Sequence, residues 1–165
     1  MSKFHLAQLN IGVGRGPIDS AVMADFVAQL DEINALAERS PGFVWRLKDD
    51  AGDATAFRPY GDDTLVNMSV WEDPVALRNY VYRSAHSAVM KRRREWFEHM
   101  REAYLVLWWV PIGHMPTVEE AWARLSSLRS RGPTAAAFTF AKLFPPPDAH
   151  SGEALDDISD TCPAL

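Results

Sequence analysis

Residues 65–74 read Leu-Val-Asn-Met-Ser-Val-Trp-Glu-Asp-Pro, and their pattern predicts the central strand and the start of the helix that follows it. Side chains of a strand alternate between its two faces. One face of a strand here carries Leu65, Asn67, Ser69 and Trp71. The opposite face carries only apolar side chains, those of Val66, Met68 and Val70. Asp73 is then a helix N-cap, and Pro74 takes the first helical position, where its missing N–H breaks no hydrogen bond. The stretch predicts a strand with one polar and one apolar face, followed by a helix.

The predicted helix runs from Pro74 to about Met100, with a bend expected at Arg83-Ser84. Spacings of three, four and seven residues keep side chains on one stripe of a helix. This stripe carries Tyr82, His86, Arg93 and Phe97. If the helix packs on the polar face of the strand, an amide, an indole, an imidazole and a guanidinium converge on one cleft. We predict the functional site there.

The composition is that of a folded protein with one domain. The chain has 165 residues, of which 47% are hydrophobic, enough for a sizeable core. Its formal net charge of −5 argues against general nucleic-acid affinity. The one cysteine, Cys162, cannot form an internal disulfide. The N-terminus lacks a signal pattern, and no apolar run reaches about 18 residues. We therefore expect a cytoplasmic protein with no nucleic-acid and no membrane partner.

The order of the predicted elements indicates an α+β fold. Strands are expected at Phe4–Ile11, Phe43–Lys48, 65–71 and Leu105–Val110, and helices at about Ser20–Ala37 and Pro74–Met100. The order β-α-β-β-α-β is that of the ferredoxin-like, split-βαβ fold, an antiparallel sheet with helices on one face. Thr117 and Glu120 form a capping box for an extra helix, and Ala136–Leu143 is predicted as an extra strand. We assign residues 1–143 to this domain and residues 144–165 to a disordered acidic tail.

The second face of the predicted sheet needs a cover. Val66, Met68 and Val70 lie on it, and Leu105–Val110 is apolar without alternation, as expected of a strand covered on both faces. A second copy of the same sheet is the simplest cover, so we expect a homodimer.

Two segments resemble one superfamily. Residues 67–77 (Asn-Met-Ser-Val-Trp-Glu-Asp-Pro-Val-Ala-Leu), with Tyr80 and His86, resemble the dimeric α/β-barrel superfamily of antibiotic-biosynthesis monooxygenases. Residues 82–97 carry Tyr-Arg-Ser-x-His-x-x-Val-Met-x-Arg-Arg-x-Glu-Trp-Phe, which is similar to a block of an uncharacterised bacterial branch of it. The resemblance covers roughly Phe4 to Phe140. It implies a barrel formed by two subunits, with a pocket in each between sheet and helices.

The resemblance also implies site residues. Quinone-forming members oxygenate phenolic polyketides without metal or flavin, and in them an Asn and a Trp four residues apart line the pocket. A helical Arg about 20 residues later completes the set. Asn67 and Trp71 have this spacing, and the twentieth residue after Trp71 is Lys91, followed by Arg92. Other members bind haem through a His on the second helix, where His86 lies.

The leading interpretation is a cofactor-independent monooxygenase, or a related tailoring enzyme, for an aromatic or polyketide-like small molecule. Asn67 and Trp71 are predicted to orient the substrate, His86 to move a proton, and Arg92 or Arg93 to hold an anion. Substrate-binding side chains are predicted to be Trp45, Ser69, Tyr82, Met90, Phe97 and Trp108.

Plainer interpretations stay open for these residues. Asn67 would equally pair with a loop backbone, Trp71 is more often a core residue, and His86 is commonly a half-exposed structural histidine. The run Lys91–Arg94 spans more than a helical turn and would be solvated beside Glu95. Two alternative functions follow, haem binding with His86 as axial ligand and non-enzymatic binding of a small molecule. The five histidines are scattered without metal-ligand spacing, so we expect no metal site.

Overall fold

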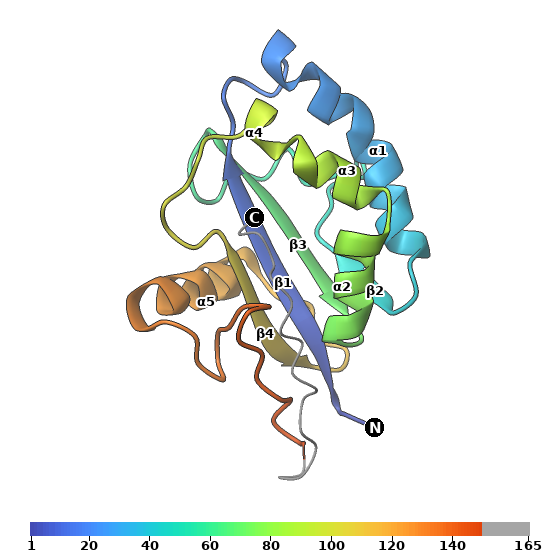
Figure 1. Ribbon diagram of the computed structural model, residues 1–165, viewed down its shortest axis with the longest axis vertical. Coiled ribbons are helices and arrows are strands. Elements are labelled where there is room, and N and C mark those ends of the chain that lie inside the picture. The colour runs from blue at the N-terminus through green and yellow to red at the C-terminus, as the bar shows by residue number, and fades with distance from the viewer. Residues whose placement is uncertain (150–165) are drawn as a thin grey trace.

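A computed structural model describes residues 1–149, and in this part of the chain four strands form one sheet (Figure 1). The strands are β1 (Phe4–Val13), β2 (Phe43–Arg46), β3 (Thr64–Trp71) and β4 (Leu105–Pro111). Their spatial order is β2-β3-β1-β4, and every neighbouring pair is antiparallel. This is the ferredoxin-like order, so the predicted α+β fold class is confirmed.

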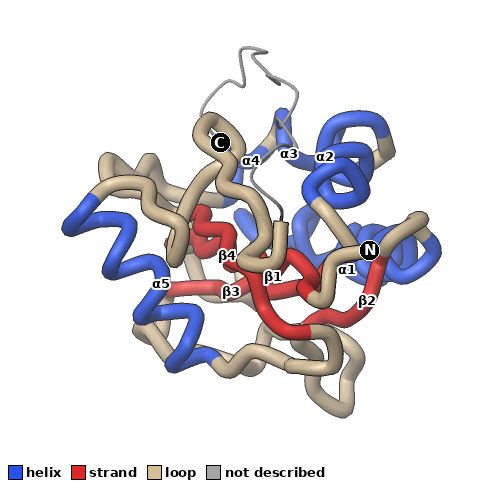
Figure 2. The backbone as a smooth tube through the Cα atoms, turned by 90° about the horizontal axis from the view of Figure 1, so that it is seen from below, coloured by secondary structure: helices blue, strands red, loops and turns tan. Residues whose placement is uncertain are grey.

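The helices lie on both sides of this sheet. They are the short 3-10 helix η1 (Ala21–Met23), α1 (Ala24–Arg39), α2 (Pro74–Arg83), α3 (His86–Lys91), α4 (Arg93–Trp96) and α5 (Val118–Arg131). Helices α1 to α4 lie on one side and α5 on the other (Figures 1 and 2). Asp73 Oδ1 accepts a hydrogen bond from the Ala76 backbone N–H at 2.8 Å, as expected of the predicted N-cap. Thr117 Oγ1 likewise accepts from the Glu120 N–H at 3.1 Å. The Glu120 carboxylate bonds to other side chains instead, so the predicted capping box is half formed.

The long helix predicted over Pro74–Met100 is divided into three. Ser84 has an extended backbone and ends α2. Its hydroxyl donates a hydrogen bond to the Tyr80 carbonyl and accepts one from the His86 N–H at 3.2 Å. The expected bend at this point is confirmed. The expected end is wrong, because Phe97 is already extended and pairs with Gly14 in the loop after β1.

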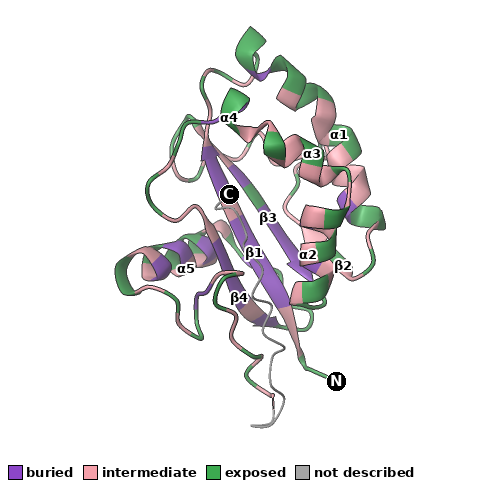
Figure 3. Cartoon of the chain, in the orientation of Figure 1, coloured by how far each residue is buried: buried purple, intermediate pink, exposed green. Residues whose placement is uncertain are grey.

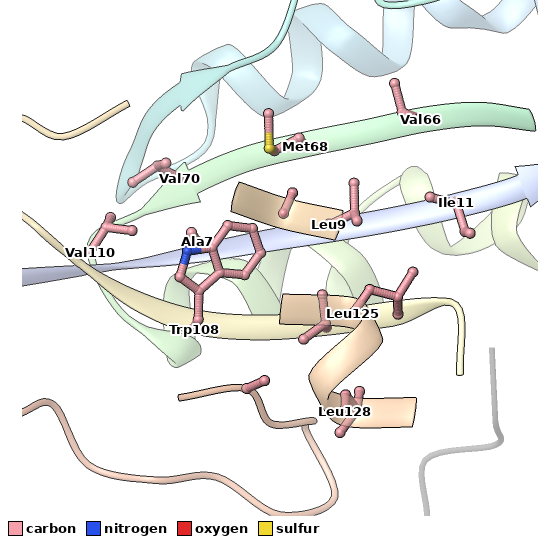
Figure 4. Packing of buried hydrophobic residues seen from close by; sticks show 13 residues of the cluster. Ala7, Leu9, Ile11, Val66, Met68, Val70, Trp108, Val110, Leu125 and Leu128 are labelled. Carbon is pink, nitrogen blue, oxygen red and sulfur yellow. The ribbon is translucent and has the colours of Figure 1, made fainter. Parts of the chain in front are cut away.

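The strands next to α5 are mostly buried (Figure 3), and apolar side chains fill the sheet face under this helix (Figure 4). The strands contribute side chains that are at most 6% exposed, those of Ala7, Leu9, Ile11, Val66, Met68, Val70, Val106, Trp108 and Val110. Helix α5 adds Ala121, Leu125 and Leu128. The premise that this face needs a second copy of the chain is therefore wrong, because α5 of the same chain covers it. A homodimer stays a prediction that rests on the resemblance.

The strand predicted over Ala136–Leu143 does not form. One bridge joins Phe138 to Leu107 of β4, and tight turns at Thr134–Ala137 and Thr139–Lys142 interrupt the segment on both sides. The extra helix is present as predicted, and the extra strand is reduced to this bridge.

Residues 144–149, which the sequence assigns to a tail, contact the domain. The Asp148 carboxylate accepts hydrogen bonds from Ser2 Oγ at 2.9 Å and from the Lys3 backbone N–H at 2.6 Å. The rest of the predicted tail, residues 150–165, lies outside the described residues. Within residues 1–149, no helix is long and apolar enough to cross a membrane.

Candidate functional site

A cavity of about 150 Å³ lies between the sheet and the helices of the opposite face. Strands β1 and β3 form its floor, and side chains of α1, α2, α3 and α4 enclose it. An engineered protein cavity of about this size holds one benzene molecule. The volume therefore matches a ligand with a single ring.

Four polar side chains on the cavity floor form what we call the polar ladder: Gln8, Asn10, Asn67 and Ser69. Strand pairing places Gln8 opposite Ser69 and Asn10 opposite Asn67. Gln8 Nε2 donates to Asn67 Oδ1 at 2.6 Å and to Ser69 Oγ at 2.9 Å. Gln8 and Ser69 are 5% and 7% exposed, whereas Asn67 is exposed. The polar ladder is thus buried at one end and open at the other.

Trp71 shares a strand face with Asn67 but is not part of the cavity wall. Its indole is fully buried, stacked on the Tyr80 ring at 5.0 Å between centroids, with Phe43 edge-on at 5.4 Å. Its Nε1 donates to Ser69 Oγ at 2.8 Å. Because α2 covers this end of β3, Trp71 acts on the cavity only through Ser69.

His86 begins α3 and lines the cavity beside Tyr80, with the two ring centroids 4.7 Å apart. Burial lowers the pKa of His86 to about 4, and a hydrogen bond with the Val81 backbone opposes this shift. The Nδ1 atom is buried and has no hydrogen-bond partner in residues 1–149. The imidazole is therefore neutral at pH 7, with a buried nitrogen available to a ligand.

Arg93 brings positive charge to the cavity. Its guanidinium lies 4.9 Å from the centroid of the Phe97 ring and 4.8 Å from that of Tyr104, and it donates to the Ile11 carbonyl at 2.8 Å. Burial lowers the pKa of Arg93. No carboxylate of the described residues lies within 4.0 Å of its nitrogen atoms. A partly desolvated cation without a counter-ion favours an anionic ligand.

The neighbouring Arg92 points out of the cavity. Its guanidinium pairs with Asp25 at 2.9 Å and with Glu95 at 2.8 Å, and its side chain is 40% exposed. It also lies over the Trp96 ring, 4.9 Å from the centroid. Arg92 is therefore a solvated surface arginine, and of the two candidates only Arg93 faces the cavity.

Phe97 packs directly on Gly12 of β1. A Cβ atom at Gly12 would lie 2.6 Å from Phe97 Cδ1, closer than carbon atoms approach. Glycine at this position therefore sets how near the Phe97 ring, and the Arg93 guanidinium stacked on it, come to the sheet.

A family model described as "Domain of unknown function (DUF3291)" matches residues 5–154. The chain belongs to the DUF3291 family. In structure, the DUF3291 chain is similar to SnoaB, described as a cofactor-independent oxygenase from Streptomyces nogalater, at 18% identity and a TM-score of 0.41. That match covers 69% of this chain and 96% of SnoaB.

A protein of unknown function from Nitrosomonas europaea matches at 16% identity and a TM-score of 0.43, over 70% of this chain and 95% of its own. A Pseudomonas aeruginosa protein matches at 12% identity and a TM-score of 0.44, over 67% and 95%. Because these TM-scores are below 0.5, we base no conclusion on the similarity. We assign the DUF3291 fold from its strand order. A comparison with curated proteins finds no match.

The DUF3291 cavity brings together those predicted site residues that come from β3, α3, α4 and the residue after α4. They are Asn67, Ser69, His86, Met90, Arg93 and Phe97. This placement agrees with the predicted packing of the helix on the polar face of the strand. The chemical roles of these residues stay predictions.

The other predicted site residues lie outside the cavity wall: Trp45, Trp71, Tyr82, Arg92 and Trp108. Trp108 belongs to the apolar face under α5, and its Nε1 donates to Glu120 Oε1 at 2.9 Å. Trp45 packs against the same apolar face, because the register shifts between Phe43 and Trp45, as in a β-bulge. Tyr82 packs edge-on against Phe140, with ring centroids 6.2 Å apart.

Several polar cavity residues were not predicted from the sequence, among them Gln8, Asn10, Arg46 and Tyr80. Gln8 and Asn10 did leave a signal, since two polar residues alternate on a strand that is otherwise apolar. Arg46 left none, because its role depends on the fold; its charge is paired with Glu38 at 3.0 Å.

The residues of the DUF3291 cavity can be compared with those that a metal ion or haem requires. Residues 1–149 contain no group of three or more His, Cys, Asp or Glu side chains placed to hold a metal ion. His86 offers the kind of nitrogen that ligates haem iron. A porphyrin, however, carries four pyrrole rings and is much larger than a cavity that holds one ring. The cavity is therefore too small to enclose haem.

Proposed function

We propose that the cavity of this DUF3291 protein binds a single-ring phenol as its anion, and that the protein oxygenates this phenol with O₂ without a bound cofactor. The observation that carries the proposal is Arg93, a partly buried cation that has no carboxylate partner in the described residues and faces a cavity of about 150 Å³. The resemblance of residues 67–97 to antibiotic-biosynthesis monooxygenases supports the choice of reaction.

The proposed reaction balances without an added reductant. A phenol with a hydrogen on its para carbon reacts with one O₂ to give a para-quinone and one water molecule. One oxygen atom forms the new C=O bond at the para carbon. The other leaves as water, with the phenolic hydrogen and the para hydrogen. The phenol supplies all four electrons that reduce O₂.

The side chains around the cavity support the first step, loss of the phenolic proton. Arg93 and Asn67 would hold the phenolate oxygen by hydrogen bonds and stabilise its charge. Burial keeps the pKa of His86 at about 4, so the imidazole is neutral at pH 7 but is on its own a weak base. An anion bound beside the imidazole raises that pKa, which favours the transfer.

The cavity also narrows the class of substrate. A volume of about 150 Å³ favours one aromatic ring over the polycyclic polyketides that the resemblance implies. An electron-rich, single-ring phenol is therefore the substrate class that we propose.

The test uses 2,6-dimethoxyphenol, which is electron-rich and has a free para carbon. We expect the purified protein to consume one O₂ per quinone formed, measured with an oxygen electrode and by quinone absorbance. Replacing Asn67 by Ala removes a hydrogen bond to the phenolate and lowers kcat/KM by roughly tenfold or more. The matched control is Asn79→Ala, which alters an exposed asparagine of α2 outside this cavity.

Two results would contradict the proposal. Oxygen uptake that is equal in wild type and Asn67→Ala would move the reaction away from this cavity. A phenol that binds in the cavity without any O₂ uptake would favour the non-enzymatic binding protein.

A further inference from the structure

Gln8 lies at the buried end of the polar ladder and uses its amide hydrogens within it. Its Nε2 lies 2.6 Å from Asn67 Oδ1 and 2.9 Å from Ser69 Oγ, and the residue is 5% exposed. A primary amide has two N–H hydrogens, so these two bonds leave none for a ligand. Gln8 therefore offers no donor of its own to the cavity.

Ser69 is saturated as an acceptor. Its Oγ accepts hydrogen bonds from Gln8 and from Trp71 Nε1, the second at 2.8 Å. A hydroxyl oxygen has two lone pairs, and both are occupied here, so only the O–H hydrogen remains. Because Ser69 lines the cavity, it can meet a ligand only as a donor.

The amide of Asn67 is oriented by the same glutamine. Its Oδ1 faces Gln8, which turns its Nδ2 away from Gln8. In the part of the chain that the structure describes, no group accepts a hydrogen bond from this Nδ2. Since Asn67 is exposed and lines the cavity, its N–H hydrogens are available to a ligand.

We propose that Gln8 is a positioning residue that makes Ser69 and Asn67 hydrogen-bond donors to the cavity, so that a ligand atom facing these two side chains is an acceptor. The oxygen atoms of a phenolate, a quinone or a carboxylate meet this requirement. The inference rests on the proposed function in taking this cavity as the ligand site, but it does not require oxygenation. If both amides were turned over, Asn67 would present its oxygen, and the wall would prefer a neutral phenol.

The experiment measures which form of 4-nitrophenol the protein binds. The phenolate of this single-ring probe absorbs visible light and the neutral phenol does not. A pH titration with saturating protein therefore reports the preference for phenolate over phenol. We expect the wild-type protein to bind the phenolate more tightly, which lowers the apparent pKa of the bound probe.

Two substitutions at Gln8 separate positioning from charge. Gln8→Met keeps the length of the side chain, adds no charge and removes both donated hydrogen bonds, so Ser69 and Asn67 are free to rotate. We expect its preference for phenolate to fall by roughly tenfold. Gln8→Glu adds a carboxylate that accepts from both neighbours, and we expect a larger loss. Gln29→Met and Gln29→Glu are matched controls at a half-buried glutamine of α1 that lies outside the cavity wall, and their preference should equal that of wild type.

The results distinguish this inference from the proposed function. If Gln8→Met, folded by circular dichroism, keeps the wild-type preference, the inference is overturned while the cavity remains a ligand site. A wild-type preference for the neutral phenol overturns the inference as well, because it indicates the reversed amides. If wild type binds neither form, the proposed ligand site fails and the inference fails with it.

Discussion

The two faces of the sheet are built from the same four strands and differ in what covers them. Under α5, side chains such as Leu9 and Trp108 are fully buried in a filled apolar layer. Under α1 to α4, the neighbouring residues Gln8 and Asn10 belong to the polar ladder on a cavity floor. Strand alternation thus allows one strand to supply packing to one face and hydrogen-bonding groups to the other. We expect the filled face to set stability and the hollow face to set ligand binding.

Neighbouring residues of β1 test this division most strongly. Leu9→Ala removes a fully buried side chain from the filled face, and we expect a loss of roughly 3 kcal/mol in the free energy of unfolding. Asn10→Ala changes the cavity floor, where no apolar packing is lost, and should change that free energy by less than about 0.5 kcal/mol. Urea unfolding followed by circular dichroism measures both. Equal losses would mean that the two faces do not differ in this way.

Acid should destabilise the folded protein through His86, which lies on the cavity side of the sheet. Burial holds the pKa of its imidazole at about 4, below the ordinary value of about 6.5, so the unfolded chain binds the proton more readily. The stabilising contribution is fully present above about pH 6.5 and is lost as the pH falls toward 4. Between pH 7 and pH 4, the free energy of unfolding of the wild type should therefore fall by on the order of 3 kcal/mol more than that of His86→Phe.

Other groups also titrate over this range, but they are the same in both proteins, so the difference between the two losses isolates the imidazole. Urea unfolding of both proteins at pH 7 and at pH 4 measures this difference. Parallel losses in wild type and His86→Phe would show that the imidazole is hydrated in the folded protein.

The adjacent arginines give a smaller and purely functional contrast. Arg93→Gln removes the cavity cation, and we expect the Kd for 4-nitrophenolate to rise by roughly thirtyfold, or about 2 kcal/mol. Arg92→Gln removes a surface charge paired with Asp25 and Glu95 and should leave this Kd within about twofold. Isothermal titration calorimetry measures both. An equal effect of the two substitutions would indicate long-range attraction by net positive charge rather than contact in the cavity.

The parts of the fold that follow from local patterns could be predicted from the sequence. The alternation of Asn67 with its apolar neighbours gave the two faces of β3, and Asp73-Pro74 gave the start of α2. The element order gave the ferredoxin-like sheet. Helical spacing placed His86 and Arg93 together, since both lie on the stripe that packs over the polar face of β3.

The rest depends on packing at a distance. Trp71 has the right spacing from Asn67, yet α2 and Tyr80 cover it, and no local pattern reports how far along a strand a helix extends. The shift in register before Trp45 moves that side chain to the other face, because one extra residue reverses the alternation. The sequence predicted that a second chain covers the filled face, whereas α5 covers it. The sequence of an amphipathic helix shows that one side is buried but not which surface that side packs against.

The size of the side chain at position 12 affects where the cavity side chains lie. Its missing side chain leaves the space that the Phe97 ring occupies, and the Arg93 guanidinium is stacked on that ring. Adding one methyl group, as in Gly12→Ala, pushes the ring outward and carries the cation with it. A substitution at Gly12 of β1 would thus change the distance between the Arg93 guanidinium and a bound anion, without changing any charged residue.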